Sequence, residues 1–136
     1  VIPGLIYRFH EAKINNLQSI TVWGTGKPKR EFLYVDDMAK ACIHLMNIDK
    51  KIHAKYTSPM CSHINIGSGK DLTIKELAET IKEVVGFKGK INFDPTKPDG
   101  SARKFLDSKR INNTGFEHQT SLKYGLLKTY QDYTKA

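Results

Sequence analysis

A stretch near the start of the chain combines residue types that suit an anionic ligand with an aromatic ring. It reads Val22-Trp23-Gly24-Thr25-Gly26-Lys27-Pro28-Lys29-Arg30-Glu31-Phe32-Leu33-Tyr34-Val35-Asp36-Asp37. The indole of Trp23 offers a flat face to a ring, and the guanidinium of Arg30 can donate to two phosphate oxygens at once. Together these side chains predict one wall of a pocket for a nucleotide-like molecule.

The same residues could also have plain structural roles. Arg30 could be an ordinary surface arginine after a turn, and Trp23 could close the core of a small domain. The neighbouring carboxylates Asp36 and Asp37 suit the positive end of a helix better than a catalytic acid pair. The histidines show no spacing typical of metal ligands or of a catalytic dyad, so we expect structural or exposed roles for all of them: His10, His44, His53, His63 and His118.

The composition is that of an ordinary globular protein with an excess of positive charge. The chain has 136 residues, of which 39% are hydrophobic, and its net charge is +8. This balance favours polyanionic partners, but the lysines are spread along the chain and form no long run. We expect an anionic small molecule as ligand, with no nucleic acid, no membrane and no metal. A basic RNA-binding module and a non-catalytic interaction domain are the alternatives. Two isolated cysteines, Cys42 and Cys61, favour a reduced, cytoplasmic protein.

The apolar pattern predicts a small mixed α/β domain with about four helices and four or five short strands. Longer helices are expected from Pro3 to about Leu17, over 37–46, after Thr73 and after Ser121. Strands are expected over 20–23, 32–35, 63–66 and 90–93, with an extended segment over 105–107.

Turn and cap residues mark where these elements begin and end. Asp36 or Asp37 is predicted to cap the second helix, and Ser108 to cap a short helix ending near residue 112. Thr73 and Glu76 have the spacing of a capping box, and Gly86 is predicted to end that helix. The polar segment 49–62 is predicted to be a surface loop, and 94–100 a rigid loop rich in turn residues. Gly67-Ser68-Gly69 lacks the third glycine of a dinucleotide-binding loop and is interpreted as a turn.

Several stretches resemble the extended short-chain dehydrogenase/reductases that act on nucleotide sugars. The superfamily resemblance is carried by Arg30–Ala39, 64–69 and 72–78. Further stretches narrow it to the GDP-L-fucose synthase family, and they are 1–3, 8–12, 59–65 and 97–104. The resemblance covers essentially the whole chain, and its specificity comes from the combination of motifs.

The resemblance implies a two-domain enzyme that converts GDP-4-keto-6-deoxy-D-mannose to GDP-L-fucose by 3,5-epimerisation and NADPH-dependent 4-reduction. In that family the N-terminal half holds NADP and the catalytic Ser, Tyr and Lys, and the C-terminal part binds the GDP-sugar. Residues 1–136 are expected to form a single C-terminal GDP-sugar-binding domain, a piece of a longer enzyme without catalytic or cofactor-binding residues. Its expected partners are the N-terminal Rossmann domain and, in the whole enzyme, a second copy in a homodimer.

The family's substrate contacts carry over onto five positions of this chain. The resemblance implies that Arg8 and Arg30 hold the diphosphate and that Trp23 lies against the guanosine or the sugar. Asp99 would accept hydrogen bonds from ribose hydroxyls or the base edge, and Lys104 would add positive potential at the mouth.

Three of these side chains could have roles that involve no ligand. Arg8 could pair with Glu11 or Glu31, Asp99 before Gly100 suits a turn, and Lys104 could be an ordinary solvated lysine. Another nucleotide-sugar epimerase, dehydratase or reductase is the alternative within the superfamily, and a preference for GDP over UDP would separate the two.

Overall fold

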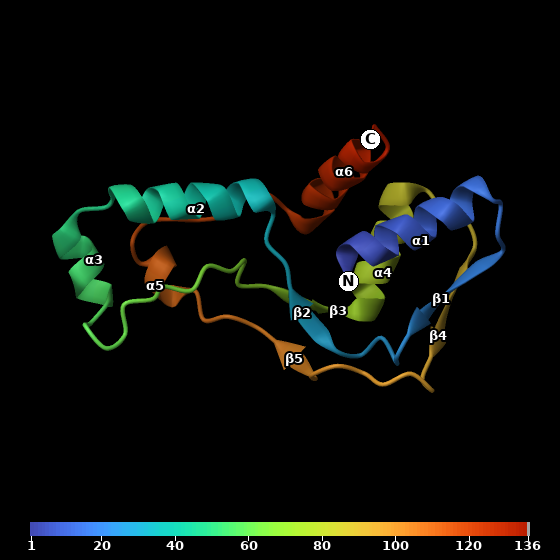
Figure 1. Cartoon of the computed structure of the whole chain (residues 1–136), viewed down its shortest axis with the longest axis horizontal. Helices are drawn as coiled ribbons and strands as arrows, with labels where there is room; N and C mark the ends of the chain where they lie inside the picture. Colours follow the sequence, from blue (N-terminus) through green and yellow to red (C-terminus); the bar gives the residue numbers. More distant parts are fainter. Residues whose placement is uncertain (136) are drawn as a thin grey trace. The chain divides into compact units, whose positions relative to one another are not determined.

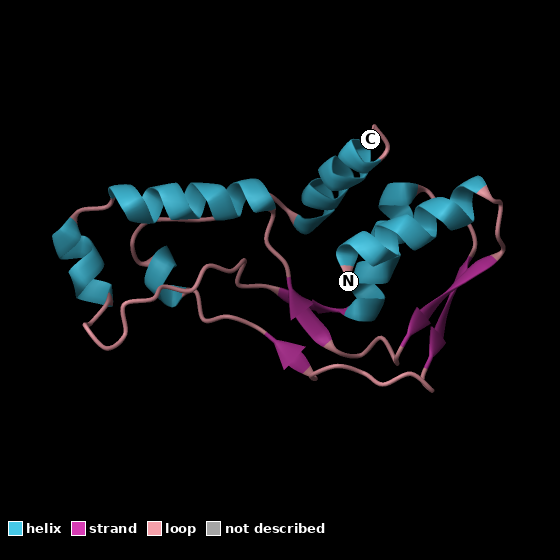
Figure 2. Ribbon diagram, viewed as in Figure 1, coloured by secondary structure: helices cyan, strands magenta, loops and turns pink. Residues whose placement is uncertain are grey.

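The computed structural model describes residues 1–135 of the chain, which divide into two compact units. The first unit contains residues 1–30, 72–104 and 123–135, and the second contains 31–71 and 105–122. Both helices and short strands are present, so the predicted mixed α/β class is correct (Figures 1 and 2).

The first unit is built on two parallel strands and two helices that pack together. Strand β1 (Ser19–Trp23) pairs in parallel with β4 (Lys90–Asp94), and Figure 2 shows the two strands side by side. Helix α1 (Ile2–Ile14) packs on α4 (Ile74–Val85) and on β1. Helix α6 (Leu122–Tyr133) is the last helix of the described residues, and all of it except Leu122 belongs to this unit.

The local sequence explains why α1 and β1 form. Pro3 stands in the first turn of α1, where a missing N–H costs nothing, and apolar residues recur on one helical face. Phe9 on that face is fully buried and its ring lies 5.7 Å from that of Phe87. In β1 the side chains alternate between exposed and buried, so Ile20 and Val22 face the core.

Helix α4 has the predicted ends. The Glu76 N–H donates to Thr73 Oγ1 at 3.1 Å, and the Thr73 N–H donates to Glu76 Oε2 at 2.7 Å. This reciprocal pair is the predicted capping box, which satisfies two of the free N–H groups of the first turn. Gly86 ends the helix with φ of +76°, a conformation that costs glycine little.

A second set of short strands departs from the prediction. Strand β2 covers Lys29–Glu31, ahead of the predicted strand at 32–35, and helix α2 (Val35–Asn47) already begins at the end of that predicted strand. Strands β3 (Asp71–Thr73), β2 and β5 (Arg103–Lys104) form one sheet in that order. The apolar run at 32–35 misled the prediction because pairing depends on a partner strand, and β5 pairs with the charged residues before that run.

The second unit contains α2 (Val35–Asn47), α3 (Lys50–Tyr56) and α5 (Lys109–Asn112). The prediction of a surface loop over 49–62 was therefore wrong for α3. Asp49 explains this helix, because its Oδ1 accepts the Lys51 N–H at 2.7 Å and caps the first turn. The predicted strand at 63–66 is also wrong, since those residues have no strand assignment.

The predicted cap side chains of α2 and α5 make no cap hydrogen bond. Tyr34 is the N-cap of α2, and Asp37 instead accepts the Thr120 N–H at 2.8 Å through Oδ2. Ser108 does occupy the N-cap position of α5, but its hydroxyl makes no cap bond and is buried without a hydrogen-bond partner. Within the described residues, no helix has the length and apolar character needed to span a bilayer.

Candidate functional site

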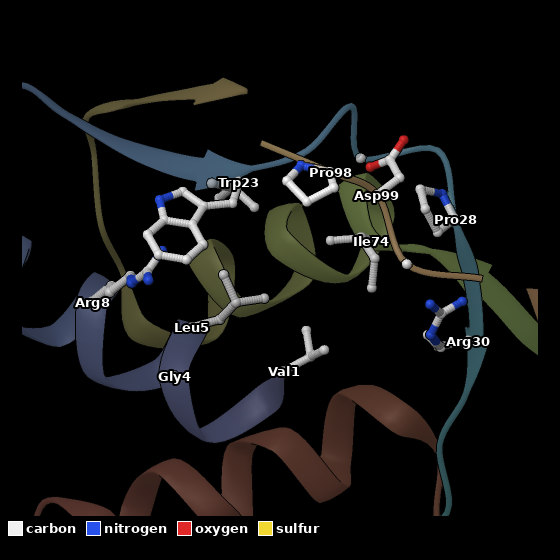
Figure 3. Close-up of a pocket in the computed structure, with 13 residues that line it drawn as sticks. Val1, Gly4, Leu5, Arg8, Trp23, Pro28, Arg30, Ile74, Pro98 and Asp99 are labelled. Carbon is white, nitrogen blue, oxygen red and sulfur yellow. The ribbon is translucent and has the colours of Figure 1, made fainter. Parts of the chain in front are cut away.

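The first unit contains a cavity of about 450 Å³, drawn in Figure 3. This volume lies in the range of small-molecule binding pockets, about 300–1,000 Å³. Four of the five predicted ligand-binding residues line it, namely Arg8, Trp23, Arg30 and Asp99. Lys104 is not part of the lining, but it is exposed on β5 in register with Arg30.

The remaining lining is mostly apolar and includes residues of α1, β1 and α4. Leu5 and Gly4 lie on α1, and Ile74 lies at the start of α4 (Figure 3). Val22 lies on β1. At Gly4 an added Cβ would meet nothing within 4 Å, so the helix leaves open space here. An apolar floor with a few polar groups above it is typical of sites that hold an organic ligand in one orientation.

Trp23 and Arg8 form one side of the pocket. The Arg8 guanidinium lies 5.5 Å from the centre of the indole, and its Nη1 donates to the Thr21 carbonyl at 3.4 Å. Trp23 is 63% exposed, so the alternative of a buried core aromatic is wrong. The ammonium of Lys97 also lies 5.7 Å from the indole centre, which no sequence motif indicated. The exposed ring is therefore held in place by two cations that interact with its π system.

Arg30 lies on the side of the pocket formed by β2. Its Nη1 donates to the carbonyls of Lys29 at 2.6 Å and of Ser101 at 2.7 Å, which fixes the guanidinium in place. The Cβ position of Gly100 lies 3.0 Å from Arg30 Nη2, so a larger residue there would press on the guanidinium. Arg30 is thus a half-buried, oriented arginine, with N–H donors on Nη2 and Nε beyond those two bonds.

Asp99 makes a bidentate contact with the turn after Trp23. Its Oδ1 accepts the Thr25 N–H at 2.9 Å, and its Oδ2 accepts the Thr25 hydroxyl at 2.6 Å. These bonds to Thr25 lower the pKa of Asp99, with a smaller contribution from the charge of Lys27. The carboxylate is therefore ionised and oriented at neutral pH.

Residues 1–67 match the model of the NAD dependent epimerase/dehydratase family. The chain is 53% identical over 131 residues to GDP-L-fucose synthase from Escherichia coli strain K12, covering 96% of this chain and 41% of that protein. It is 50% identical over 135 residues to GDP-L-fucose synthase 1 from Arabidopsis thaliana, covering 99% of this chain and 39% of the relative.

The chain is a homologue of the GDP-L-fucose synthases. It spans about two-fifths of the length of these relatives. The chain is also similar to the solved structure of a GDP-mannoheptose C4 reductase from Campylobacter jejuni with NADP bound, with a TM-score of 0.82 and 36% sequence identity. The alignment covers 98% of this chain and 44% of the reductase. The resemblance to extended short-chain dehydrogenase/reductases is thereby confirmed, and the chain corresponds to their C-terminal part.

The run Gly67-Ser68-Gly69 of this chain does not have the contacts of a dinucleotide-binding loop. The Gly69 N–H donates to Glu31 Oε1 at 2.7 Å, and a Cβ at Gly67 would collide with the same carboxylate. A dinucleotide loop offers its N–H groups to phosphate, whereas a carboxylate in that place repels phosphate. The run also leads into strand β3 rather than into a helix. The run Gly67-Ser68-Gly69 therefore does not fit the phosphates of a dinucleotide.

A Tyr-x-x-x-Lys spacing occurs in this chain at Tyr124 and Lys128 on α6. The expectation from the sequence that this spacing is absent from the chain was therefore wrong. The Lys128 ammonium lies 5.8 Å from the centre of the Tyr124 ring, a cation–π contact within one helix, and neither residue lines the cavity. Residues 1–135 hold no cluster of three metal-binding side chains.

Proposed function

We propose that this chain is the GDP-sugar-binding region of an enzyme of the GDP-L-fucose synthase type. The observation that carries the proposal is the convergence of Arg8, Trp23 and Arg30 on one cavity with an apolar floor. They come from a helix, a strand and a second sheet, so only the fold brings them together. The substrate of the whole enzyme would be GDP-4-keto-6-deoxy-D-mannose.

In this proposal each side chain of the cavity has a separate role. Arg30 would donate to the diphosphate, because its guanidinium is already oriented by two carbonyls. Trp23 would lie against a ring of the ligand, and Arg8 would approach the diphosphate from α1. Lys104 would contribute positive potential from β5. Holding the diphosphate in place while the sugar ring turns between reaction steps is positional catalysis.

The epimerisation and reduction steps would need groups from outside this chain. NADPH supplies the hydride for the 4-reduction in this class of reaction, and the run Gly67-Ser68-Gly69 does not fit its phosphates. We therefore expect the isolated chain to bind the GDP-sugar without converting it. A cytoplasmic location and a homodimeric whole enzyme stay predictions.

The cofactor-binding region would be a second partner, and α2 offers a surface that supports this. At 100° per residue, most of its exposed small and apolar side chains fall on one stripe, namely Val35, Met38, Ala39, Cys42 and Met46, and the exposed Ile43 lies beside that stripe. Asp37 and Ala41 lie on the opposite, buried side of the helix. A continuous apolar stripe on an exposed helix is typical of a contact with another folded region.

Calorimetric titration of the chain with GDP-mannose and with UDP-glucose tests the binding proposal. We expect saturable binding of GDP-mannose and a weaker response to UDP-glucose. Arg30→Ala should lower the affinity by about tenfold, the effect of losing a hydrogen bond to a charged group. Lys135→Ala, which removes the same charge from an exposed site at the end of the chain, is the matched control. A folded chain without GDP-mannose binding would contradict the proposal.

Short RNA is the second titrant in the same experiment. The RNA-binding alternative predicts an affinity that falls steeply with salt, because binding would release counterions from the phosphate backbone. Salt-sensitive RNA binding that exceeds GDP-mannose binding at physiological ionic strength would favour that alternative.

A further inference from the structure

Two segments that are distant in sequence meet at the mouth of the cavity. The turn after β1 carries Thr25, and the loop between β4 and β5 carries Asp99, 74 positions later. Thr25 donates to both carboxylate oxygens of Asp99, through its N–H at 2.9 Å and its hydroxyl at 2.6 Å. Figure 3 shows the carboxylate pointing toward that turn and away from Leu5 and Val1.

The turn is shaped to receive this carboxylate. Gly24 has φ of +87°, and a Cβ there would collide with Asp99 Oδ1, so both its conformation and its size require glycine. The Thr25 hydroxyl also accepts the Lys27 N–H at 3.3 Å, so the same side chain joins both halves of the turn. The Gly24 N–H donates to the Asp94 carbonyl at 2.9 Å, which fixes the start of the turn.

The loop that carries Asp99 is held at a second point. Ser101, two residues later, receives a hydrogen bond from Arg30 at 2.7 Å. Between β4 and that point, the ammonium of Lys97 lies over the indole of Trp23. The bonds between Thr25 and Asp99 therefore join the segment next to Trp23 to the segment that positions Arg30.

We propose that Asp99 is a positioning residue that fastens the Trp23 turn to the Arg30-bound loop, and that it does not contact the nucleotide. Both carboxylate oxygens already accept strong hydrogen bonds, and a carboxylate beside the diphosphate would repel it. The ligand would instead be held by the groups that Asp99 keeps in place, Trp23 and Arg30. The effect of Asp99 on ligand binding rests on the proposed function. Its connection of the Trp23 turn to the Arg30-bound loop does not.

The fastening can be measured without any ligand, because Trp23 is the single tryptophan of the chain. We expect Asp99→Ala and Thr25→Val each to raise acrylamide quenching and to lower the fluorescence anisotropy of Trp23. The double variant should be no more mobile than Asp99→Ala, since both changes break one connection. Asp132→Asn, which removes a negative charge from an exposed position on α6, should leave Trp23 unchanged. Unchanged Trp23 mobility in Asp99→Ala would overturn the fastening.

GDP and a GDP analogue without ribose hydroxyls separate a positioning role from a direct contact. Asp99→Ala should weaken GDP binding by about tenfold, as expected for broken charge-assisted bonds. Thr25→Val should weaken it in the same direction, and Asp99→Asn, which retains an acceptor for the Thr25 N–H, should recover part of the loss. The preference for GDP over the analogue should be the same in every variant.

A direct contact predicts the opposite pattern. If Asp99 binds the ribose, Asp99→Ala removes the preference for GDP over the analogue, and its effect adds to that of Thr25→Val; either result would overturn the proposal. Failure of the parent chain to bind GDP would contradict the proposed function instead, and the Trp23 measurements would still decide whether Asp99 fastens the turn.

Discussion

The two units of the molecule distribute apolar and polar side chains in different ways. Of the buried apolar side chains in the described part of the chain, only Ala41 and Ile111 belong to the second unit. The buried polar side chains, Asp37 and Ser108, both belong to it, and each has a buried oxygen without a hydrogen-bond partner. The first unit thus has an apolar core of its own, whereas the second buries few apolar side chains and holds the buried Asp37 through its Oδ2, which accepts the Thr120 N–H.

Both units expose large apolar side chains, but these side chains lie in different settings. The second unit exposes Met46 at 83% and Met60 at 96% of their surface, in addition to the rest of the α2 stripe. Trp23, the most exposed aromatic side chain of the first unit at 63%, borders the cavity. The candidate ligand site therefore lies on the unit with the larger apolar core, whereas the exposed apolar side chains of α2 lie on the other unit.

Phe9→Ala should have the largest effect, because it removes the centre of the first unit's core. Phe9 is fully buried against Phe87, and truncating such a ring costs about 3–5 kcal/mol of unfolding free energy. Urea denaturation followed by circular dichroism measures this. Ile14→Ala on the same helix is the control, since Ile14 is 55% exposed and should cost far less. Equal costs for the two variants would show that α1 does not pack as described.

Asp37 should give the second unit a dependence on pH. Burial raises the pKa of Asp37, but the hydrogen bonds from Thr120 and the charge of Lys40 together outweigh it, so the pKa lies below the ordinary value of 3.8. The stabilisation is therefore complete above that ordinary pKa and is lost as the pH falls through the lowered one. Asp37→Ala should cost about 1.5–3 kcal/mol at neutral pH, the worth of hydrogen bonds to a charged group.

Unfolding free energies measured from pH 7 down to pH 2 test this. The difference between the parent chain and Asp37→Ala should shrink as the pH approaches 2, whereas Asp132→Asn should follow the parent closely. A difference that stays constant with pH would mean that the carboxylate of Asp37 is not the stabilising group.

Elements that are fixed by local sequence could be predicted, whereas contacts with distant partners could not. Helices α1 and α4 follow from local signals, namely apolar periodicity, Pro3, and the capping pair Thr73 and Glu76. Strand β5 and the early start of β2 could not be predicted, because the pairing of Arg30 with Lys104 is decided by a distant partner. Asp37 was interpreted as a cap for a similar reason, since its real partner lies 83 positions away.

The candidate site shows the same limit. The residue types of Trp23 and Arg30 indicated a ligand wall, and the family resemblance added Arg8 and Asp99, which line the same cavity. Nothing local indicated that Asp99 would use both oxygens on Thr25. A bond across 74 positions has no sequence signature without the fold.

Ser108→Ala should have a smaller effect, and in the opposite direction. The hydroxyl of Ser108 is buried without a partner, so the folded state bears its desolvation cost. Removing it should leave the unfolding free energy unchanged or raise it by up to about 1 kcal/mol. Thr73→Ala is the contrasting variant, because loss of a satisfied cap costs about 0.5–2 kcal/mol. A destabilised Ser108→Ala would indicate that the hydroxyl has a partner in solution, and the contrast between the two units would weaken.

Met46→Lys should have the smallest effect on folding and the clearest effect on association. Met and Lys have similar helix propensities and Met46 is 83% exposed, so the unfolding free energy should change by less than about 0.5 kcal/mol. A charge within the apolar stripe should reduce concentration-dependent self-association, which sedimentation velocity measures.

Asn47→Lys separates the effect of the stripe from that of net charge, because it adds the same charge at an exposed polar position of α2. If only Met46→Lys reduces association, the stripe is the contact surface. If both variants reduce it equally, the effect is general repulsion in a chain that already carries a net charge of +8. If Met46→Lys unfolds the chain, the stripe is packed within the unit, and α2 does not carry an exposed apolar stripe in solution.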